Sequence, residues 1–344
     1  MTPKRVDHRR REPAPGVFRL SLPLPFPGLH QVNAYLLAGE GMTLVDCGLY
    51  LPDDDADHGW DHVVAALAAV DVTPEDIDTL VLTHTHIDHF GMAGRLKEES
   101  GCRVLYHPNG DRELELLRDP AGFAARLRDT FSSHGVAEED LDDLTRYEDW
   151  RGFVHSLVPP DAALEDGDRF AVGGREWKAI HTPGHSISHL CLWSKDGGLL
   201  ISGDHLLGSI TPHIDFRGGD EDPLGDYLAS LEIIEKIEPR IVLPGHGHPF
   251  AEGAERARVT ARHHERRLGA ILQVVRHQAC TASQITDAIF GSTLLHFQRR
   301  LALGEALAHI RYLQARGEVE RVADEDGAVR FRKVSRRPVA EVPE

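Results

Sequence analysis

Three histidines and one aspartate lie within a six-residue stretch, at His84, His86, Asp88 and His89. They follow the apolar run 78–82, which we expect to form a buried strand. Residues two apart in an extended chain point the same way, so the imidazoles of His84 and His86 can reach one ion. Asp88 and His89 lie past the end of the strand, and their side chains can face a second position close to that ion. Imidazole and carboxylate groups are ligands of zinc and related metals, so the stretch predicts a metal site rather than a His-rich surface loop.

Three more candidate ligands follow later apolar runs that we expect to be strands. They are His185, Asp204 and His246, and a glycine directly precedes each of them. Glycine permits a close backbone approach, so that a short loop can present a ligand. Strand ends in an α/β sheet share one edge, where these proteins place their sites. We therefore expect the three side chains to meet the first cluster.

Asp46 ends the apolar run 42–46 and has two alternative roles. An aspartate at this place can cap a turn. It can equally support the metal ligands from behind, as polar groups around a metal often do. Two further histidines, His205 and His248, lie beside ligand positions. We expect them to support the site or the structure rather than to act as catalytic acids.

The cluster at 84–89, the three later ligands and Asp46 together resemble the metallo-β-lactamase-fold hydrolases. The resemblance covers roughly residues 14–253. It implies an α/β fold, the αββα metallo-β-lactamase sandwich, with a dinuclear metal centre. Asp88 and Asp204 favour the glyoxalase II-like and nuclease-like branches of this family over the antibiotic-hydrolysing branch.

The resemblance also implies how the ligands divide between the metals. One metal would be held by His84, His86 and His185. The other would be held by Asp88, His89 and His246. Asp204 would bridge the two metals, and Asp46 would orient the ligands from behind.

Two cations a few ångströms apart can hold a water deprotonated near neutral pH and polarise a carbonyl or phosphoryl oxygen. We therefore expect a bridging hydroxide to be the nucleophile, without a catalytic serine or cysteine. Asp88 and Asp204 are the predicted catalytic residues, and Asp88 can also accept or pass a proton. Two zinc ions are the expected cofactors. Iron and manganese stay open, because sites of histidine and aspartate accept all three metals.

Residues 110–160 interrupt the alternation of strands and helices. They are charged, and their apolar residues have helical spacing, so we predict a helical insertion in the hydrolase domain. Such an insertion could cover the site as a lid, with a structural cap as the alternative. The substrate pocket is expected to include Ser209, Thr211 and Tyr227.

The chain beyond residue 253 has a different pattern. Three helical segments, at 262–278, 283–290 and 301–316, precede a hairpin with an Asp-Gly turn at 324–327. This arrangement resembles a winged helix. A winged helix after such a hydrolase core is similar to a subgroup that includes β-lactamase-like endoribonucleases.

We accordingly predict a disordered lead at 1–13, a hydrolase domain at 14–253 and a winged-helix-like domain at 254–344. Residues 254–344 hold 16 Lys and Arg against 11 Asp and Glu, whereas the rest of the chain holds 22 against 44. A winged helix can bind nucleic acid or serve as an interaction module. Its third helix carries no dense basic stripe, so nucleic-acid binding is not favoured.

The formal charge of −17 argues against a protein that coats nucleic acid or an anionic membrane. The acidic body favours hydrolysis of a small ester, thioester or lactone. A single-strand endoribonuclease stays the alternative because of the winged-helix tail. A binding protein with a purely structural metal is less favoured, because structural zinc prefers closed, cysteine-rich sites.

The remaining composition suggests an ordinary intracellular enzyme. We see neither a signal peptide nor a transmembrane helix, and we expect a cytoplasmic location. The four cysteines form no CxxC pair and are expected to be buried or free thiols in a reducing compartment. We expect a small-molecule substrate and no membrane partner, and a homodimer stays open.

Overall fold

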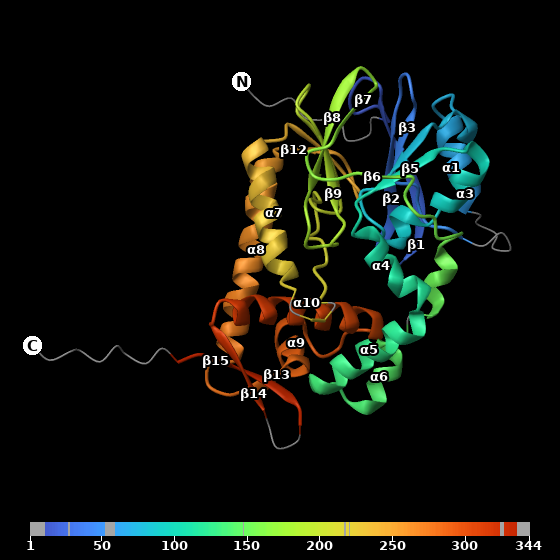
Figure 1. The fold of residues 1–344 in the computed structure, drawn as a ribbon. Coiled ribbons are helices and arrows are strands. Elements are labelled where there is room, and N and C mark those ends of the chain that lie inside the picture. Colours follow the sequence, from blue (N-terminus) through green and yellow to red (C-terminus); the bar gives the residue numbers. More distant parts are fainter. Residues whose placement is uncertain are drawn as a thin grey trace, which may run out of the picture. The chain divides into compact units, whose positions relative to one another are not determined.

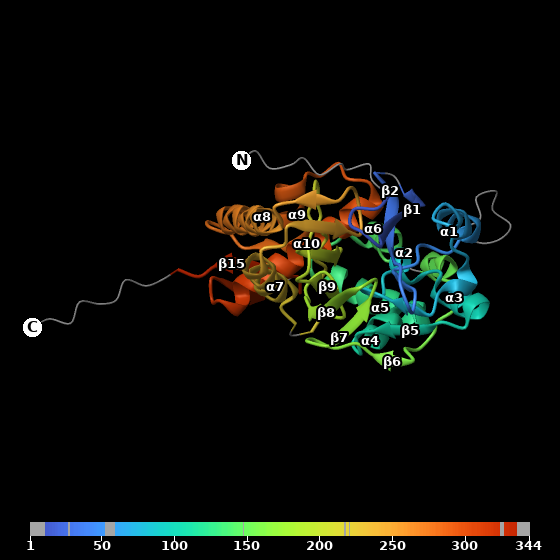
Figure 2. The same ribbon diagram turned by 90° about the horizontal axis from the view of Figure 1, so that it is seen from above.

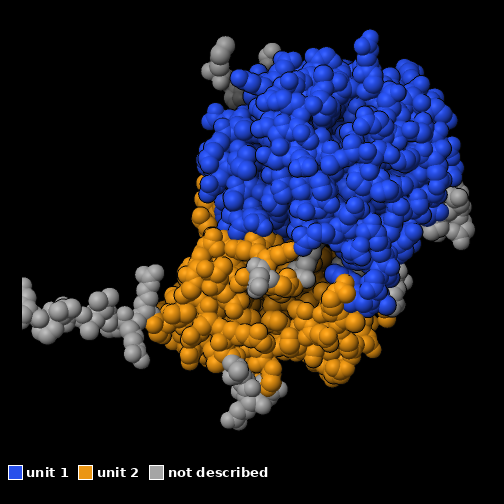
Figure 3. Space-filling view, viewed as in Figure 1, with its two compact units in different colours: residues 1–123, 147–214, 225–261 blue, residues 124–146, 215–224, 262–344 orange. Residues whose placement is uncertain are grey.

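The computed structural model describes residues 11–26, 28–51, 59–146, 148–216, 218–219, 221–323 and 327–335. Most of the predicted lead 1–13 lies outside these residues. The chain divides into two compact units, coloured separately in Figure 3. The first unit comprises residues 1–123, 147–214 and 225–261. The second comprises residues 124–146, 215–224 and 262–344.

The first unit contains two six-stranded sheets. The first sheet has the order β1 (Val17–Phe26), β2 (Leu29–Leu37), β3 (Thr43–Val45), β4 (Thr79–Val81), β5 (Arg103–Tyr106) and β6 (Ala162–Ala163). Strands β1 to β3 are antiparallel, whereas β3 to β6 run parallel. The carboxyl ends of β3 and β4 therefore lie side by side, and they lead directly to Asp46 and to the cluster at 84–89.

The second sheet supplies the other strand ends. Its order is β12 (Phe250–Ala251), β11 (Ile241–Pro244), β10 (Leu199–Gly203), β9 (Leu190–Ser194), β8 (Arg175–His181) and β7 (Arg169–Val172). Strands β10 and β11 pair in parallel. Asp204 follows β10 and His246 follows β11, so these two residues leave neighbouring strands at the same edge.

Layers of helices enclose the two sheets (Figures 1 and 2). Buried side chains from both sheets, among them Tyr35 and Trp177, form one core between them. A second core lies where α1 (Gly59–Ala68) and α3 (Ala93–Ser100) cover the other face of the first sheet. The helix α7 (Pro223–Ile237) lies on the outer side of the second sheet. The predicted αββα sandwich is thereby confirmed.

The segment predicted as a helical insertion is helical over most of its length. It contains α4 (Gly110–Arg118), α5 (Pro120–Ser133), α6 (Glu138–Leu144) and the 3₁₀ turn η2 (Glu148–Phe153). Two shorter elements precede it, the 3₁₀ turn η1 (Pro74–Asp76) and α2 (Ile87–Phe90). Whether the insertion acts as a lid remains a prediction.

The second unit carries the helices and the hairpin of the C-terminal segment. Its elements are the later turns of α8 (Gly253–Val274), then α9 (Ala282–Phe290), α10 (His296–Ala315) and a sheet of β13 (Cys280–Thr281), β15 (Val329–Lys333) and β14 (Val319–Ala323). The hairpin of β14 and β15 agrees with the predicted one. Most of its predicted Asp-Gly turn, at 324–326, lies outside the described residues. The assignment of this unit as a winged helix stays a prediction.

The division into units differs from the predicted domain boundaries at residues 124–146 and 215–224. Both stretches group with the C-terminal helices by contact. The backbone N–H of Ser283 donates to the carbonyl of His134 at 3.1 Å, and that of Phe216 donates to the carbonyl of Gly304 at 3.3 Å. Sequence order alone does not reveal such packing between distant segments.

Within the described ranges, no helix is both long and apolar enough to cross a membrane. The cysteines are buried and form no disulfide, as expected for free thiols; they are Cys47, Cys102, Cys191 and Cys280.

Candidate metal centre

The centre lies where β3, β4, β10 and β11 end. The short helix α2 begins at Ile87, so Asp88 and His89 project from its first turn while His86 precedes it. Gly203, the residue before Asp204, has φ +45°, and an added Cβ atom would lie 2.7 Å from His189 Nε2. Only glycine fits there without displacing a neighbour.

Three imidazoles form what we call the first ligand group: His84, His86 and His185. One ring nitrogen from each member lies within 4.8 Å of those of the other two. His84 Nε2 and His86 Nδ1 are 3.0 Å apart. Both the spacing and the chemistry suit a borderline cation such as zinc.

The second ligand group is Asp88, His89 and His246, whose donor atoms also lie within 4.8 Å of one another. His246 Nε2 is 3.2 Å from Asp88 Oδ2. His89 Nε2 is 3.8 Å from the same oxygen. This group combines two imidazoles with one carboxylate, a donor set that a divalent metal accepts.

Asp204 lies between the two groups. Its Oδ2 is 3.7 Å from His185 Nε2 and 3.2 Å from His246 Nε2. Its Oδ1 is 3.5 Å from His89 Nε2. The carboxylate therefore faces members of both groups, and its bridging of two metals stays a prediction.

The rings of the histidines are oriented by partners outside the two groups. His185 Nδ1 donates to the carbonyl of His213 at 2.7 Å, and His246 Nδ1 donates to that of Gln31 at 2.8 Å. His89 Nδ1 donates to Asp46 Oδ2 at 2.8 Å. These bonds keep a proton on Nδ1 of each ring and direct Nε2 at the centre, so that Nε2 is the atom that a metal would bind.

Asp46 lies behind two of the candidate ligands, His84 and His89. It is buried and has φ 60°, a conformation rare for aspartate. Its carboxylate accepts hydrogen bonds from His89 Nδ1 and from the backbone N–H of Thr83 at 2.8 Å. The Thr83 hydroxyl also donates to it and lies 3.0 Å from His84 Nδ1. One carboxylate thus orients two ligand rings.

The protein groups of the centre perturb one another's pKa values strongly. Burial lowers the pKa of His246, but Asp204 and Asp88 outweigh it and raise the pKa to about 10. Burial raises the pKa of Asp88, but His89 and His246 lower it to about 2. Burial lowers the pKa of His84 well below its ordinary value, and the neighbouring histidines add to this effect. Asp88 is therefore charged and His84 neutral at neutral pH, and His246 carries a proton in the metal-free protein.

Two buried atoms test whether a cation fits. His89 Nε2 and Asp204 Oδ1 lie 3.5 Å apart, a long contact, and among the described residues neither atom makes a shorter hydrogen bond. Buried polar atoms are normally satisfied by a partner. A cation held between the ligand groups would satisfy both atoms, so the residues present fit a metal.

Sequence reasoning missed two buried residues beside the centre. His189 Nδ1 lies 2.8 Å from Thr182 Oγ1, and its Nε2 accepts the backbone N–H of Asp204 at 3.1 Å. Glu113 accepts hydrogen bonds from Thr85, which lies between His84 and His86, and from Ser186, which follows His185. His189 stands inside an apolar run, and Glu113 inside a charged helical pattern, so neither gave a signal of its own.

The two extra histidines lie in different surroundings. His205 is fully buried, and its ring packs at 5.1 Å from the ring of Tyr227. His248 is exposed, and its Nδ1 lies 3.0 Å from an Arg19 guanidinium nitrogen. Neither contact involves a member of the two ligand groups.

The predicted pocket residues differ in exposure. Ser209 is exposed and Thr211 is partly buried. Tyr227 is fully buried, and its hydroxyl donates to the carbonyl of His205 at 2.9 Å. The tyrosine hydroxyl thus supports the loop after Asp204, and its contact with a substrate stays a prediction.

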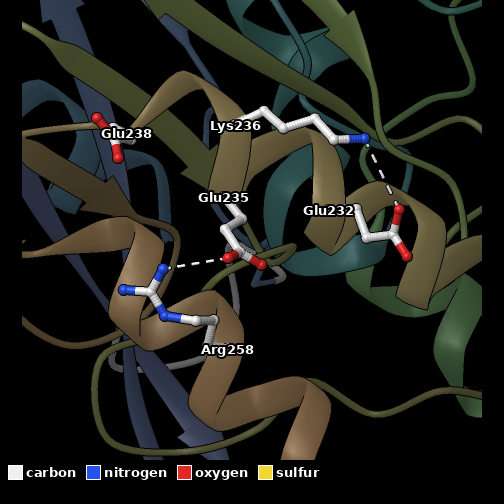
Figure 4. A pocket seen from close by; sticks show the side chains of 5 residues that line it. All are labelled: Glu232, Glu235, Lys236, Glu238 and Arg258. Atoms are coloured by element: carbon white, nitrogen blue, oxygen red, sulfur yellow. Dashed lines mark hydrogen bonds and ion pairs between the residues drawn. The ribbon is translucent and has the colours of Figure 1, made fainter.

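A surface hollow lies apart from the centre, between α7 and the start of α8 (Figure 4). Arg258 pairs with Glu235 at 3.1 Å, and Lys236 pairs with Glu232 at 3.7 Å. Glu238 is the remaining residue that lines it. These are solvent-exposed ion pairs, and no member of the ligand groups lines the hollow.

Comparison with known proteins gives matches over both units. Residues 27–246 match the family model described as "Metallo-beta-lactamase superfamily". Residues 268–334 match the one described as "Metallo-beta-lactamase-like, C-terminal domain". The chain is similar to the crystal structure of a metallo-beta-lactamase family protein from Thermus thermophilus, with a TM-score of 0.79 and 31% identity. This match covers 93% of the chain and 99% of that protein.

Two curated relatives carry names that mention a reaction. The "Probable metallo-hydrolase YqjP" of Bacillus subtilis is 26% identical over 312 residues, covering 87% of this chain and 92% of the relative. The "Atrochrysone carboxyl ACP thioesterase" of Aspergillus fumigatus is 26% identical over 280 residues, covering 76% of this chain and 69% of the relative.

Proposed function

The chain belongs to the metallo-β-lactamase superfamily and is a metal-dependent hydrolase, and we propose that it uses two divalent metal ions to hydrolyse a small ester, thioester or lactone. The observation that carries the proposal is the position of Asp204 between the two ligand groups. A single carboxylate that faces two separate sets of donors is suited to a centre with two cations.

Each ligand group would hold one ion, and zinc is the metal that its donors suit best. Ions bound there would lower the pKa of a water molecule and polarise the carbonyl of the substrate. The protein contributes the fixed orientation of the ligands, through Asp46 and the backbone carbonyls behind the rings. It also contributes Asp88, whose side chain is 14% exposed and can take up a proton at the edge of the centre.

Two observations support the proposed substrate class: the acidic charge of the hydrolase body and the name of one similar protein. The acidic hydrolase body disfavours a long phosphodiester polymer, which needs a positive approach. One relative carries the name thioesterase. Among the three carbonyl substrates, a thioester is therefore the one to test first.

A single-strand endoribonuclease is the second candidate. The observation that favours it is the C-terminal unit, in which two helices precede a hairpin. Such a module could hold a nucleic acid strand, although the formal charge of −17 opposes this.

A panel assay would separate the two candidates. Protein loaded with zinc or manganese is given acyl thioesters, aryl esters, lactones and labelled single-stranded RNA, with the Asp204→Ala variant purified alongside. We expect hydrolysis of a thioester or ester by the wild type and none by the variant. Cleavage of RNA alone, abolished by the same substitution, would replace the leading proposal with the second.

A further inference from the structure

Glu113 is a buried carboxylate that lies outside both ligand groups. It belongs to α4, and only 5% of its surface is exposed. Charged side chains are almost never buried to this extent unless their oxygen atoms are satisfied. Its hydrogen bonds therefore indicate what the residue does.

The carboxylate reaches the loop that carries His84 and His86. Its Oε2 accepts a hydrogen bond from the hydroxyl of Thr85 at 3.0 Å. Thr85 lies between these two ligands in the sequence, so this bond fixes the backbone that positions both rings. Gly110, one turn earlier on α4, allows the approach, because an added Cβ atom would lie 2.9 Å from Thr85 Cγ2.

The same carboxylate reaches the loop after His185. The Ser186 hydroxyl donates to Oε2 at 2.6 Å, and the Ser188 hydroxyl donates to the same oxygen. The backbone N–H of Ile187 donates to Oε1 at 3.0 Å. On the other side of that residue, the amide of Asn109 donates to the carbonyl of Ile187 at 3.2 Å. The loop is thus held to the start of α4 on two sides.

We propose that Glu113 is a positioning residue that joins the loops of the first ligand group and so sets the affinity of that metal position alone. Thr85 lies directly between His84 and His86. The other donors, Ser186, Ile187 and Ser188, follow His185 in one loop. None of them flanks Asp88, His89 or His246. Asp46, by contrast, bonds directly to His89. The two buried carboxylates therefore act on different parts of the centre.

Four hydrogen bonds to one buried carboxylate make this link stiff. Hydrogen bonds to a charged acceptor are shorter and roughly twice as strong as those between neutral groups. In Glu113→Gln the carboxamide nitrogen replaces one acceptor oxygen and cannot accept from a hydroxyl. The carboxamide nitrogen then faces either the Ile187 N–H, which cannot accept, or hydroxyls that must turn to accept from it. Either change weakens the link between the loops, and ligands that are displaced by a fraction of an ångström bind a metal less tightly.

The inference rests on the proposed two-metal centre, and its test uses variants that keep one metal position each. His246→Ala weakens the second position, and His86→Ala weakens the first. Glu113→Gln is added to each background, and zinc affinity is measured by competition with a chromogenic chelator. Glu115→Gln is the matched control, because Glu115 lies on the same helix with a largely exposed side chain.

We expect Glu113→Gln to lower zinc affinity by about 10–100-fold in the His246→Ala background, the range found when groups behind metal ligands are removed. In the His86→Ala background the affinity should stay as it was. An equal loss in both backgrounds, or no loss in the first, would overturn the inference. If the wild type fails to bind two ions, the proposed centre itself is wrong, which is a separate result.

A second pair of variants tests the same role if Glu113→Gln does not fold. Thr85→Val and Ser188→Ala keep the carboxylate and each remove one donor. Circular dichroism of the metal-stripped proteins checks that they fold. Each should lower zinc affinity at the first position by a smaller factor and leave the second unchanged. Wild-type affinity in both variants would contradict the proposed role.

Discussion

The Nδ1 atom of His89 lies 2.8 Å from Oδ2 of Asp46, which joins the chain past β3 to the chain past β4. The bond keeps a proton on Nδ1 of His89, so that Nε2 is the atom that can give a lone pair to a metal. In Asp46→Asn the backbone N–H of Thr83 favours the amide oxygen at the Oδ1 position, which places the amide NH₂ against His89. Nδ1 must then accept, and the proton moves to Nε2.

Asp46→Asn should therefore lower zinc affinity by about 10–100-fold, in line with other losses of groups behind a metal ligand. Equilibrium dialysis with zinc measures the effect. Asp76→Asn is a suitable control, because Asp76 forms its hydrogen bonds with Thr73 at an exposed turn. Wild-type zinc affinity in Asp46→Asn would show that the tautomer is fixed in some other way.

Asp88→Asn should separate metal binding from turnover. The amide keeps one oxygen that can face a cation, but it cannot take up a proton. We expect kcat to fall by about 10²–10⁴-fold, the usual contribution of a general base, while at least one zinc per chain is retained. Steady-state kinetics on the best substrate of the panel, with metal analysis of the same sample, would check this. Unchanged kcat would remove Asp88 from the reaction.

The free energy of unfolding of the metal-stripped protein should depend on pH, because titratable groups of the centre contribute to it. The pKa of His246 is raised from 6.5 to about 10, so its contribution is complete below pH 6.5 and lost as pH rises through about 10. The pKa of Asp88 is lowered from 3.8 to about 2, so its contribution is present above 3.8 and lost as pH falls through about 2. The centre should stabilise the stripped protein most between about pH 4 and 6.5.

Zinc should reverse this dependence above pH 6.5, because the metal displaces the protons of His246 and His89. The increase in melting temperature that zinc causes should grow from pH 6 to pH 9. Differential scanning fluorimetry with and without zinc measures it, and His246→Gln should flatten the trend. A zinc effect that is independent of pH would mean that these histidines do not bind the metal.

Gly203→Ala should damage the centre through its backbone. An added Cβ atom would lie 2.7 Å from His189 Nε2 and 2.8 Å from Thr83 Oγ1, both of which position ligands. Overpacking of this kind costs about 1–3 kcal/mol, and zinc affinity should fall with it. Urea unfolding gives the free energy of unfolding. Gly269→Ala is the control: it lies inside α8, the added atom meets nothing within 4 Å, and the change should stabilise the protein by about 0.5–1 kcal/mol without changing zinc affinity.

Much of the centre could be predicted because its ligands stand at the ends of apolar runs. The parallel pair β10 and β11 brings Asp204 and His246 together, and the parallel pair β3 and β4 brings Asp46 and His84 together. The position of Asp46 behind His89 also agrees with the resemblance. Periodicity and the spacing of ligands suffice for such features.

Other features depend on contacts that no local pattern reveals. Glu113 belongs to a helix whose sequence looks solvent-exposed, and only the packing of α4 shows that its carboxylate is buried. The burial of Tyr227 likewise follows from the close approach of α7 to Gly184, where an added Cβ atom would lie 2.4 Å from the tyrosine Cβ. The pairing of residues 124–146 with the C-terminal helices is of the same kind.

The central claim is that two metals lie at the two ligand groups. Crystals of the zinc-loaded protein, measured on both sides of the zinc absorption edge, test it most directly. The account predicts two anomalous peaks, one at His84, His86 and His185 and one at Asp88, His89 and His246, with Asp204 in contact with both. A single peak in that region, or peaks at other residues alone, would contradict it.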